Sequence, residues 1–256
     1  MAARRHVFGL FLAGLLAVTG RTAPAADATV RDALAAEARL DTRQALALFQ
    51  AASEARPGDA FLLQKIARQY SDLSVELTDA AERKAVLAQA LGYAQRAAAL
   101  DPNHAESVLS VAICRGQLAA FGDIREKVRT SRLVREDAAR ALALNPRYAW
   151  AHHVLGRWHL EVTELGATAR FFLKVFYGGL PPAAVAEAVN HLEQAATLEP
   201  DQLAHHLELG RAYAAAGQPA RARSAFETGL AMPSREKHHD LAKARGRDAL
   251  ATLPQE

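Results

Sequence analysis

Apolar residues return every three or four positions along most of this chain, from about residue 42 to residue 250. In the segment after Asp59, for example, Leu62, Ile66, Ala67 and Tyr70 would line one face of a helix. No stretch alternates apolar and polar residues as a half-buried strand does, and Ala and Leu, which are strong helix formers, dominate the composition. The pattern predicts an all-α protein.

Proline marks where these helices end. Pro57, Pro102, Pro146 and Pro200 each follow an Ala- and Leu-rich or otherwise helical run, and proline cannot continue a helix. We therefore expect helices over 42–56, from Asp59 onward, and over 78–100, 103–121, 124–144 and 147–165, then from near 182, with a capping helix near 234–250. Because the four prolines are separated by 45, 44 and 54 residues, the helices should form repeats of unequal length.

Residues 203–233 carry the most informative motif. His206, Leu209, Gly210 and Tyr213 are followed by Ala222, Phe226 and Pro233. This spacing resembles the tetratricopeptide (TPR) pattern W-x-x-L-G-x-x-Y, A-x-x-x-F and P over about 34 residues. A second copy begins at Trp150 and includes Leu155-Gly156-Arg157-Trp158. We therefore predict a TPR-like α-solenoid of about four antiparallel helix pairs, which must stack to bury their apolar faces.

The N-terminus has the composition of an export signal. Arg4 and Arg5 precede an apolar run over 7–18, and Ala23-Pro24-Ala25 offers a small-x-small cleavage site. We expect a signal peptide over 1–25, a linker or first helix over 26–41, the repeat domain over 42–251 and a tail over 252–256. The protein would then be exported, in the periplasm; an uncleaved membrane anchor is the alternative, although the run is shorter than the ~20 residues of a membrane span.

Charge and motifs exclude several function classes. The chain has 31 Lys and Arg and 28 Asp and Glu, but 1–25 holds three arginines and no acid, so the remainder is balanced at 28 each. We find no concentrated basic face, which nucleic-acid binding would require. The sequence also lacks a nucleophile elbow, a Walker loop, a dinucleotide-binding glycine motif and paired catalytic carboxylates. We therefore predict no enzyme activity, no catalytic residues and no cofactor. The single Cys114 lies in an apolar run and should be a buried, inert thiol.

An aromatic insertion interrupts the repeat after residue 165. Phe171, Phe172, Phe176 and Tyr177 lie within seven positions, and Gly178-Gly179 follows them. One interpretation is a short helix over the core, with Phe172 and Phe176 inward and the glycines as its stop. The other is an apolar lid over a ligand groove or a helix that touches a membrane, in which case Arg170 and Lys174 would face lipid headgroups.

The repeat register also predicts a ligand groove. TPR grooves are lined by fixed positions of the first helix of each pair, and this numbering selects Arg68, Trp150, His153, Arg157, Leu207 and Arg211. Guanidinium groups in a row would bind carboxylates or phosphates, in a peptide or an anionic amphiphile. The alternative is that these arginines pair with neighbouring acids, such as Glu161 one turn after Arg157.

Three adjacent histidine pairs raise the question of a metal site. They are His152-His153, His205-His206 and His238-His239. Adjacent residues on a helix point in different directions, so the two histidines of a pair cannot bind the same metal ion. No HExxH motif or zinc-type Cys/His spacing is present. We predict surface or groove histidines and no metal.

The chain resembles the regulator of microtubule dynamics family. The resemblance is strongest over 147–251, extends from 42, and rests on Leu155-Gly156-Arg157-Trp158, the aromatic insertion, Gly179-Leu180-Pro181-Pro182, Glu187-Ala188, Glu199-Pro200 and Leu209-Gly210. It implies an all-helical, non-enzymatic adaptor. Animal members are associated with microtubules, mitochondria and membrane contacts, but an exported protein would not meet microtubules. We expect a module that binds a peptide or protein in its concave groove; the alternative is a lipid-binding or lipid-transfer module at a membrane surface.

Overall fold

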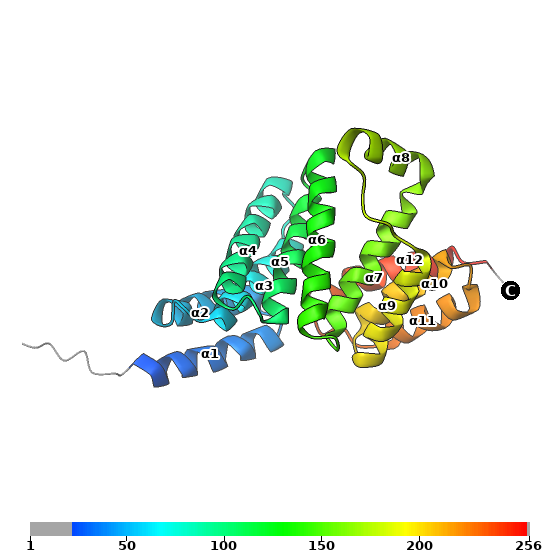
Figure 1. Ribbon diagram of the computed structural model, residues 1–256. Helices are drawn as coiled ribbons and strands as arrows, with labels where there is room; N and C mark the ends of the chain where they lie inside the picture. Colours follow the sequence, from blue (N-terminus) through cyan, green and yellow to red (C-terminus); the bar gives the residue numbers. More distant parts are fainter. Residues whose placement is uncertain (1–21, 255–256) are drawn as a thin grey trace, which may run out of the picture.

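A computed structural model describes residues 22–254, and all regular secondary structure in that range is helical (Figure 1). The helices are α1 (Thr22–Ala38), α2 (Thr42–Ala55), α3 (Ala60–Glu76), α4 (Ala80–Leu100), α5 (Ala105–Ala119), α6 (Ile124–Leu144), α7 (Ala149–Glu164), α8 (Gly166–Tyr177), α9 (Val185–Leu198), α10 (Leu203–Ala215), α11 (Pro219–Ala231) and α12 (His239–Ala251). The predicted all-α class is confirmed. Most of the predicted signal peptide, residues 1–21, lies outside the described range, and its last four residues belong to α1.

Aspartate caps begin four of these helices. Asp41, Asp59, Asp79 and Asp123 each accept a hydrogen bond from the backbone N–H three residues later. Each carboxylate thereby satisfies one of the free N–H groups of a first helical turn. At the other ends, the residues before the four repeat prolines are C-caps, as the sequence predicts: Arg56, Asp101, Asn145 and Glu199.

The helices pack as antiparallel pairs in chain order. The pairs are α1–α2, α3–α4, α5–α6, α7–α9 and α10–α11, and α12 covers the last pair (Figure 1). The described residues thus form five pairs rather than about four, because α1 completes the repeat whose second helix is α2. The first helices α3, α5, α7 and α10 also contact one another in sequence and make the inner layer of the array.

Glycine permits the close approach within the last two pairs. A Cβ on Gly156 would lie 2.6 Å from Leu192 Cγ, and one on Gly210 would lie 2.7 Å from Phe226 Cδ1. Leu192 and Phe226 are completely buried, so they fill the space where a side chain on the facing helix would be. The Leu-Gly dipeptides of the two motifs therefore have a packing role, as expected for TPR helices.

Helix α8 is inserted between the two members of the α7–α9 pair. It lies at the edge of the molecule beside the N-terminal end of α6 (Figure 1). Gly178, with φ of +75°, ends the helix in the left-handed conformation, as the sequence predicts. Arg132 of α6 then donates hydrogen bonds to the carbonyl oxygens of Tyr177 and Gly179.

The segment before α12 joins the last repeat to the second helix pair of the array. The capping helix begins at His239 rather than near Ser234, and residues 233–238 instead cross to α3. Lys237 Nζ lies 2.7 Å from Glu76 Oε1, and Arg68 lies 3.0 Å from Glu236. These contacts link positions more than 160 residues apart, so the array curves back on itself. We call residues 233–238 the crossing segment.

Candidate functional site

The inner face begins with a charged stripe on α3. Phe61, Lys65, Arg68 and Asp72 are three or four positions apart, so they share one side of the helix. The Arg68 guanidinium lies 3.0 Å from Glu236, 3.8 Å from Glu37 and 3.9 Å from Asp72. His238 Nε2 of the crossing segment lies 3.4 Å from Asp72 as well. The first predicted groove arginine is therefore surrounded by carboxylates from three parts of the chain.

The other two predicted arginines share one carboxylate. Arg157 of α7 lies 3.7 Å from Glu208 and 2.6 Å from Glu161. Arg211 of α10 lies 2.8 Å from Glu208 and 3.0 Å from Glu164. The structure thus brings Arg157 and Arg211 together across the repeat interface, with Glu208 between them, while Arg68 belongs to a separate cluster near the crossing segment.

Electrostatics at these arginines favours their internal pairing. Burial alone would lower the pKa of Arg68, Arg157 and Arg211, but the surrounding acids outweigh it and raise all three pKa values. The guanidinium groups remain charged, and their charge is already balanced. Of the two interpretations that the sequence left open, pairing with neighbouring acids is present in the structure. An anionic ligand would have to displace these acids.

The half-buried Trp150 forms a ring cluster with the buried His153 and His205. The Trp150 ring centroid lies 4.9 Å from that of His153 and 4.8 Å from that of His205. The two imidazoles meet with their Nδ1 atoms 3.0 Å apart. Burial, then the neighbouring His205 and Arg157, holds the pKa of His153 well below its usual value. His153 therefore packs between α7 and α10 and does not line an open groove, contrary to the sequence prediction.

The prediction that Leu207 lines the groove is also wrong, because the repeat register is shifted by one position. Its side chain is 3% exposed and packs against Gly229 and Gly246 in the core of the last repeat. Its neighbour Glu208 points to the inner face instead and contacts both arginines. Sequence reasoning missed Glu208, although its position three residues before Arg211 is a recognisable ion-pair spacing.

Other histidines are likewise more buried than expected. His159 and His239 are buried, and His152 and His191 meet with Nδ1 atoms 3.0 Å apart between α7 and α9. The prediction of surface or groove histidines is therefore wrong for several of them, because they fill interfaces between helices. Within residues 22–254, no group of three or more His, Cys, Asp or Glu residues is arranged to hold a metal ion.

The aromatic insertion points outward. The side chains of Phe171, Phe172 and Phe176 are 64%, 54% and 66% exposed, whereas Leu173 is the buried residue of α8. The expectation that Phe172 and Phe176 face the core is wrong, because the residue that anchors this helix is Leu173, which lies outside the arc of the exposed rings. The exposed rings also differ from a closed lid, which would turn its apolar face inward; Tyr177 alone is half-buried.

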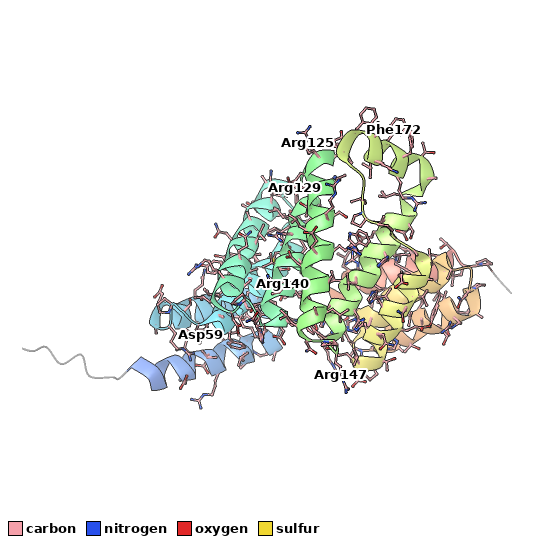
Figure 2. The ribbon with its side chains drawn as sticks, in the orientation of Figure 1. Asp59, Arg125, Arg129, Arg140, Arg147 and Phe172 are labelled. Atoms are coloured by element: carbon pink, nitrogen blue, oxygen red, sulfur yellow. The ribbon has the colours of Figure 1, made fainter. Side chains whose placement is uncertain are left out.

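A basic cluster lies beside these rings. The first half of α6, over 124–135, carries five basic residues and one acid, and Figure 2 shows Arg125 and Arg129 at the end of α6 nearest Phe172. Arg129 pairs with Glu126, the acid of this stretch. This stretch is short and is bounded by acids, since Asp123 precedes it and Glu136 and Asp137 follow it. The overall balance of charge conceals this local excess.

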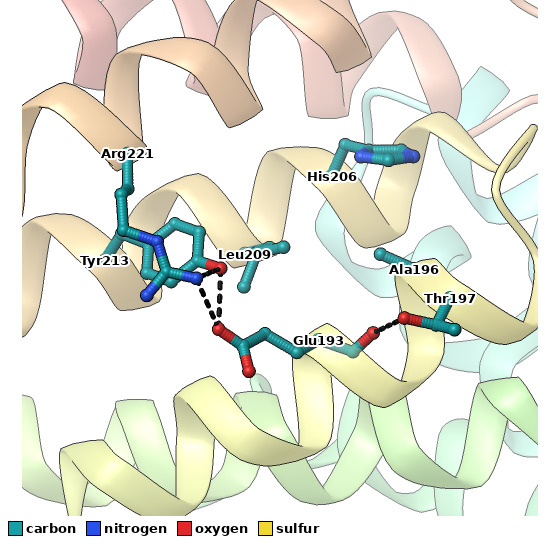
Figure 3. Close-up of a pocket in the computed structure, with 7 residues that line it drawn as sticks. All are labelled: Glu193, Ala196, Thr197, His206, Leu209, Tyr213 and Arg221. Carbon is teal, nitrogen blue, oxygen red and sulfur yellow. Dashed lines mark hydrogen bonds and ion pairs between the residues drawn. The ribbon is translucent and has the colours of Figure 1, made fainter.

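A shallow depression of about 400 Å³ lies between α9, α10 and α11. Its lining consists of Glu193, Ala196, Thr197, His206, Leu209, Tyr213 and Arg221 (Figure 3). Tyr213 Oη and Arg221 both donate hydrogen bonds to Glu193, at 2.7 Å each. The polar groups at its centre thus bind one another, and they hold the second helix of one pair against the next pair.

Cys114 is buried in α5, as predicted, and burial raises the pKa of its thiol to about 12. The thiolate that reacts with oxidants and metals is therefore disfavoured at neutral pH. In the part of the chain that the structure describes, no helix has both the length and the apolar character needed to span a membrane.

Solved structures confirm the TPR architecture. The chain is similar to a TPR protein of Thermus thermophilus, with a TM-score of 0.65 and 19% identity over 88% of this chain and 99% of that one. It is also similar to PilF of Pseudomonas aeruginosa, with a TM-score of 0.55 and 17% identity over 90% and 89% of the two chains. At these identities the likeness shows the fold alone.

Curated relatives give the family. Regulator of microtubule dynamics protein 3 of Xenopus laevis is 33% identical over 54% of this chain and 30% of its own length. Regulator of microtubule dynamics protein 1 of Bos taurus is 29% identical over 60% of this chain and 50% of its own length. The chain thus spans half or less of these relatives. The family model for regulator of microtubule dynamics protein 1-3 matches residues 29–254. The chain therefore belongs to the regulator of microtubule dynamics protein 1-3 family.

Proposed function

We propose that the chain is a non-enzymatic interaction module whose inner helix face binds a peptide or a protein partner. The TPR-like fold supports an interaction scaffold, and the relatives are named as regulators. The observation that carries the proposal is the crossing segment itself. It is a non-helical peptide laid on α3 by ion pairs of both signs, Arg68 with Glu236 and Lys237 with Glu76.

The ion pairs between the crossing segment and α3 indicate which kind of peptide the inner face would bind. Along α3 the basic Arg68 is followed by the acidic Asp72 and Glu76, so the stripe matches a segment in which an acidic residue precedes a basic one, as Glu236 precedes Lys237. Phe61, at the start of the same stripe, is half-exposed and adds an apolar contact. A partner peptide with one acidic and one basic group near an apolar residue would therefore fit better than a uniformly anionic one.

Site-specific photo-crosslinking in the producing cell tests this proposal. Phe61 would be replaced by benzoylphenylalanine, and Leu100 at the end of the outer helix α4, which has a similar exposure, would be the matched control position. We expect discrete protein adducts from position 61 and none from position 100. Equal adducts at the two positions, or none at position 61, would contradict an inner-face binding site.

A second experiment addresses the shared carboxylate cluster. In R157A/R211A, both partners of Glu208 are lost, so a partner whose contact extends from α3 to α7 and α10 should bind less tightly. R147A, an exposed arginine in the turn before α7, is the control. Circular dichroism of both variants checks that the helices persist. Unchanged binding of the identified partner in R157A/R211A would exclude the arginines from recognition.

We also infer that the chain is exported through its first 25 residues. The support is the charged start, the short apolar run and the small-x-small site at 23–25. Cell fractionation and intact mass of the C-terminally tagged chain test this inference. A periplasmic product that begins at residue 26 is expected, and a full-length product in the membrane fraction would instead indicate an anchor.

A further inference from the structure

Helix α8 exposes its apolar side to solvent, whereas a helix packed in a core buries it. At about 100° per residue, four apolar side chains fall within an arc of about 140°. These are Phe171, Phe172, Val175 and Phe176, and all are more than half exposed. A helix that belongs to a core turns such a stripe inward. We call these four residues the aromatic face.

The body of the protein holds α8 in this orientation. Leu173, which lies outside this arc about 60° beyond Phe176, is buried, and Arg132 of α6 binds the carbonyl oxygens of Tyr177 and Gly179 at the C-terminus of the helix. The aromatic face is thus presented outward by specific contacts at the back of the helix. Figure 2 shows Phe172 at the outer edge of the molecule, where it projects into solvent.

The surroundings of the aromatic face are positive. Between 165 and 186 the sequence contains no Asp or Glu, while Arg170 and Lys174 lie on α8 itself. Arg125 and Arg129 extend this charge along α6, with Glu126 as the one acid in its first half. We call Arg125, Arg129, Arg170 and Lys174 the basic edge. An apolar stripe on one side of a helix with cationic residues on the other side is typical of helices that lie in the interface of an anionic bilayer.

Other occupants fit this surface less well. A second copy of the chain would bring two basic edges together. The aromatic face is also too small for a stable dimer. A fully buried ring buries roughly 150–250 Å², and these three rings are about 60% exposed, so the face offers roughly 300–450 Å² of apolar surface. A stable protein interface buries about 800 Å² on each side. Stacking of single-stranded bases is also hindered, because the Phe172 and Phe176 rings already face each other at 6.0 Å.

We propose that the aromatic face inserts into the interfacial region of an anionic lipid bilayer while the basic edge contacts its headgroups. The convex shape of the site suits this partner, since projecting rings enter a deformable lipid layer without a complementary pocket. Contact with a bilayer would leave the inner face accessible to a partner, because α8 lies at the edge of the molecule and is not part of the inner layer of α3, α5, α7 and α10. The proposal therefore does not depend on the peptide-binding function.

The experiment places a fluorescent reporter in the aromatic face of the full chain. F172W is mixed with vesicles of phosphatidylcholine and phosphatidylglycerol, or of phosphatidylcholine alone, and its emission is compared with the wild-type signal of Trp150 and Trp158. Brominated lipids quench tryptophan that enters the bilayer. F61W, half-exposed on α3, is the matched control. We expect a blue shift and quenching for F172W with anionic vesicles, and neither for F61W.

Variants then separate the two parts of the surface. In vesicle flotation, F172A/F176A should lower partition to anionic vesicles about tenfold or more, and R170Q/K174Q should remove the preference for phosphatidylglycerol over phosphatidylcholine. I124A, another exposed apolar side chain near this end of α6, should leave partition unchanged. The proposal is overturned if F172W is not quenched, if F172A/F176A floats like the wild type, or if the aromatic face binds RNA or an acidic protein in preference to anionic vesicles.

Discussion

Gly210 offers a direct test of how closely α10 and α11 pack. A Cβ at this position would lie 2.7, 2.8 and 2.9 Å from three atoms of the Phe226 ring, which is completely buried. The ring cannot swing away as a flexible chain end would. We therefore expect G210A to destabilise the protein even though alanine is the better helix former.

The magnitude follows from two opposing effects. Gly→Ala in a helix interior favours folding by about 1 kcal/mol, and overpacking a core disfavours it by about 1–3 kcal/mol. Because three atoms of a rigid ring are involved, we expect the upper part of that range and a net loss of about 1–2 kcal/mol. Gly92, inside α4, has no atom within 4 Å of the corresponding Cβ position. G92A should therefore stabilise the protein by up to about 1 kcal/mol.

Urea unfolding followed by circular dichroism at the helical band measures both variants. The helix-propensity contribution is common to G210A and G92A, so the difference between them isolates the steric effect of the ring. F226L combined with G210A should recover part of the loss, with an interaction energy of about 0.5 kcal/mol or more. If G210A were as stable as G92A, the pair would be loosely packed and the argument from the Leu-Gly motif would be wrong.

Three further outcomes are expected. The unfolding free energy should fall as the pH drops below about 6.5, because His153 binds a proton near that pH in the unfolded chain but only at a much lower pH when folded; H153Q should reduce this pH dependence in urea titrations at a series of pH values. Cys114 should not react with a thiol reagent such as DTNB at neutral pH until urea unfolds the chain, and fast reaction of the folded protein would contradict its burial. R132Q should increase limited proteolysis within 166–180, because it removes the hydrogen bonds that hold the end of α8, while cleavage elsewhere stays unchanged.

Local sequence patterns are enough to predict most of the fold. Apolar periodicity and proline locate the helix ends within a few residues, and α6 has the predicted bounds. Asp59 caps its helix because side-chain capping is a local interaction. The start of α12 could not be predicted in this way. Ser234 after Pro233 resembles a helix start, but the crossing segment is held by Glu76 and Arg68, which are far away in the sequence.

The candidate site was harder to predict than the fold. The register of a repeat is uncertain by one residue, which is enough to exchange buried Leu207 for inward-facing Glu208. The pairing of Arg157 with Glu161 could be foreseen from their spacing, whereas its contact with Glu208 depends on how two repeats stack. For α8, the sequence predicts a short aromatic helix that ends at Gly178, but it cannot say whether the rings of Phe172 and Phe176 face protein or solvent.

The crossing segment changes how the repeats respond to a partner. In an open solenoid each repeat contacts only its neighbours, and the ends unfold independently. Here the ion pairs of Lys237 and Glu236 connect the last repeat to α3, so the stability of distant repeats is coupled. A ligand that displaces the crossing segment from α3 would break these ion pairs. Amide exchange would then rise in α1 and in α12 together, although the ligand touches neither helix.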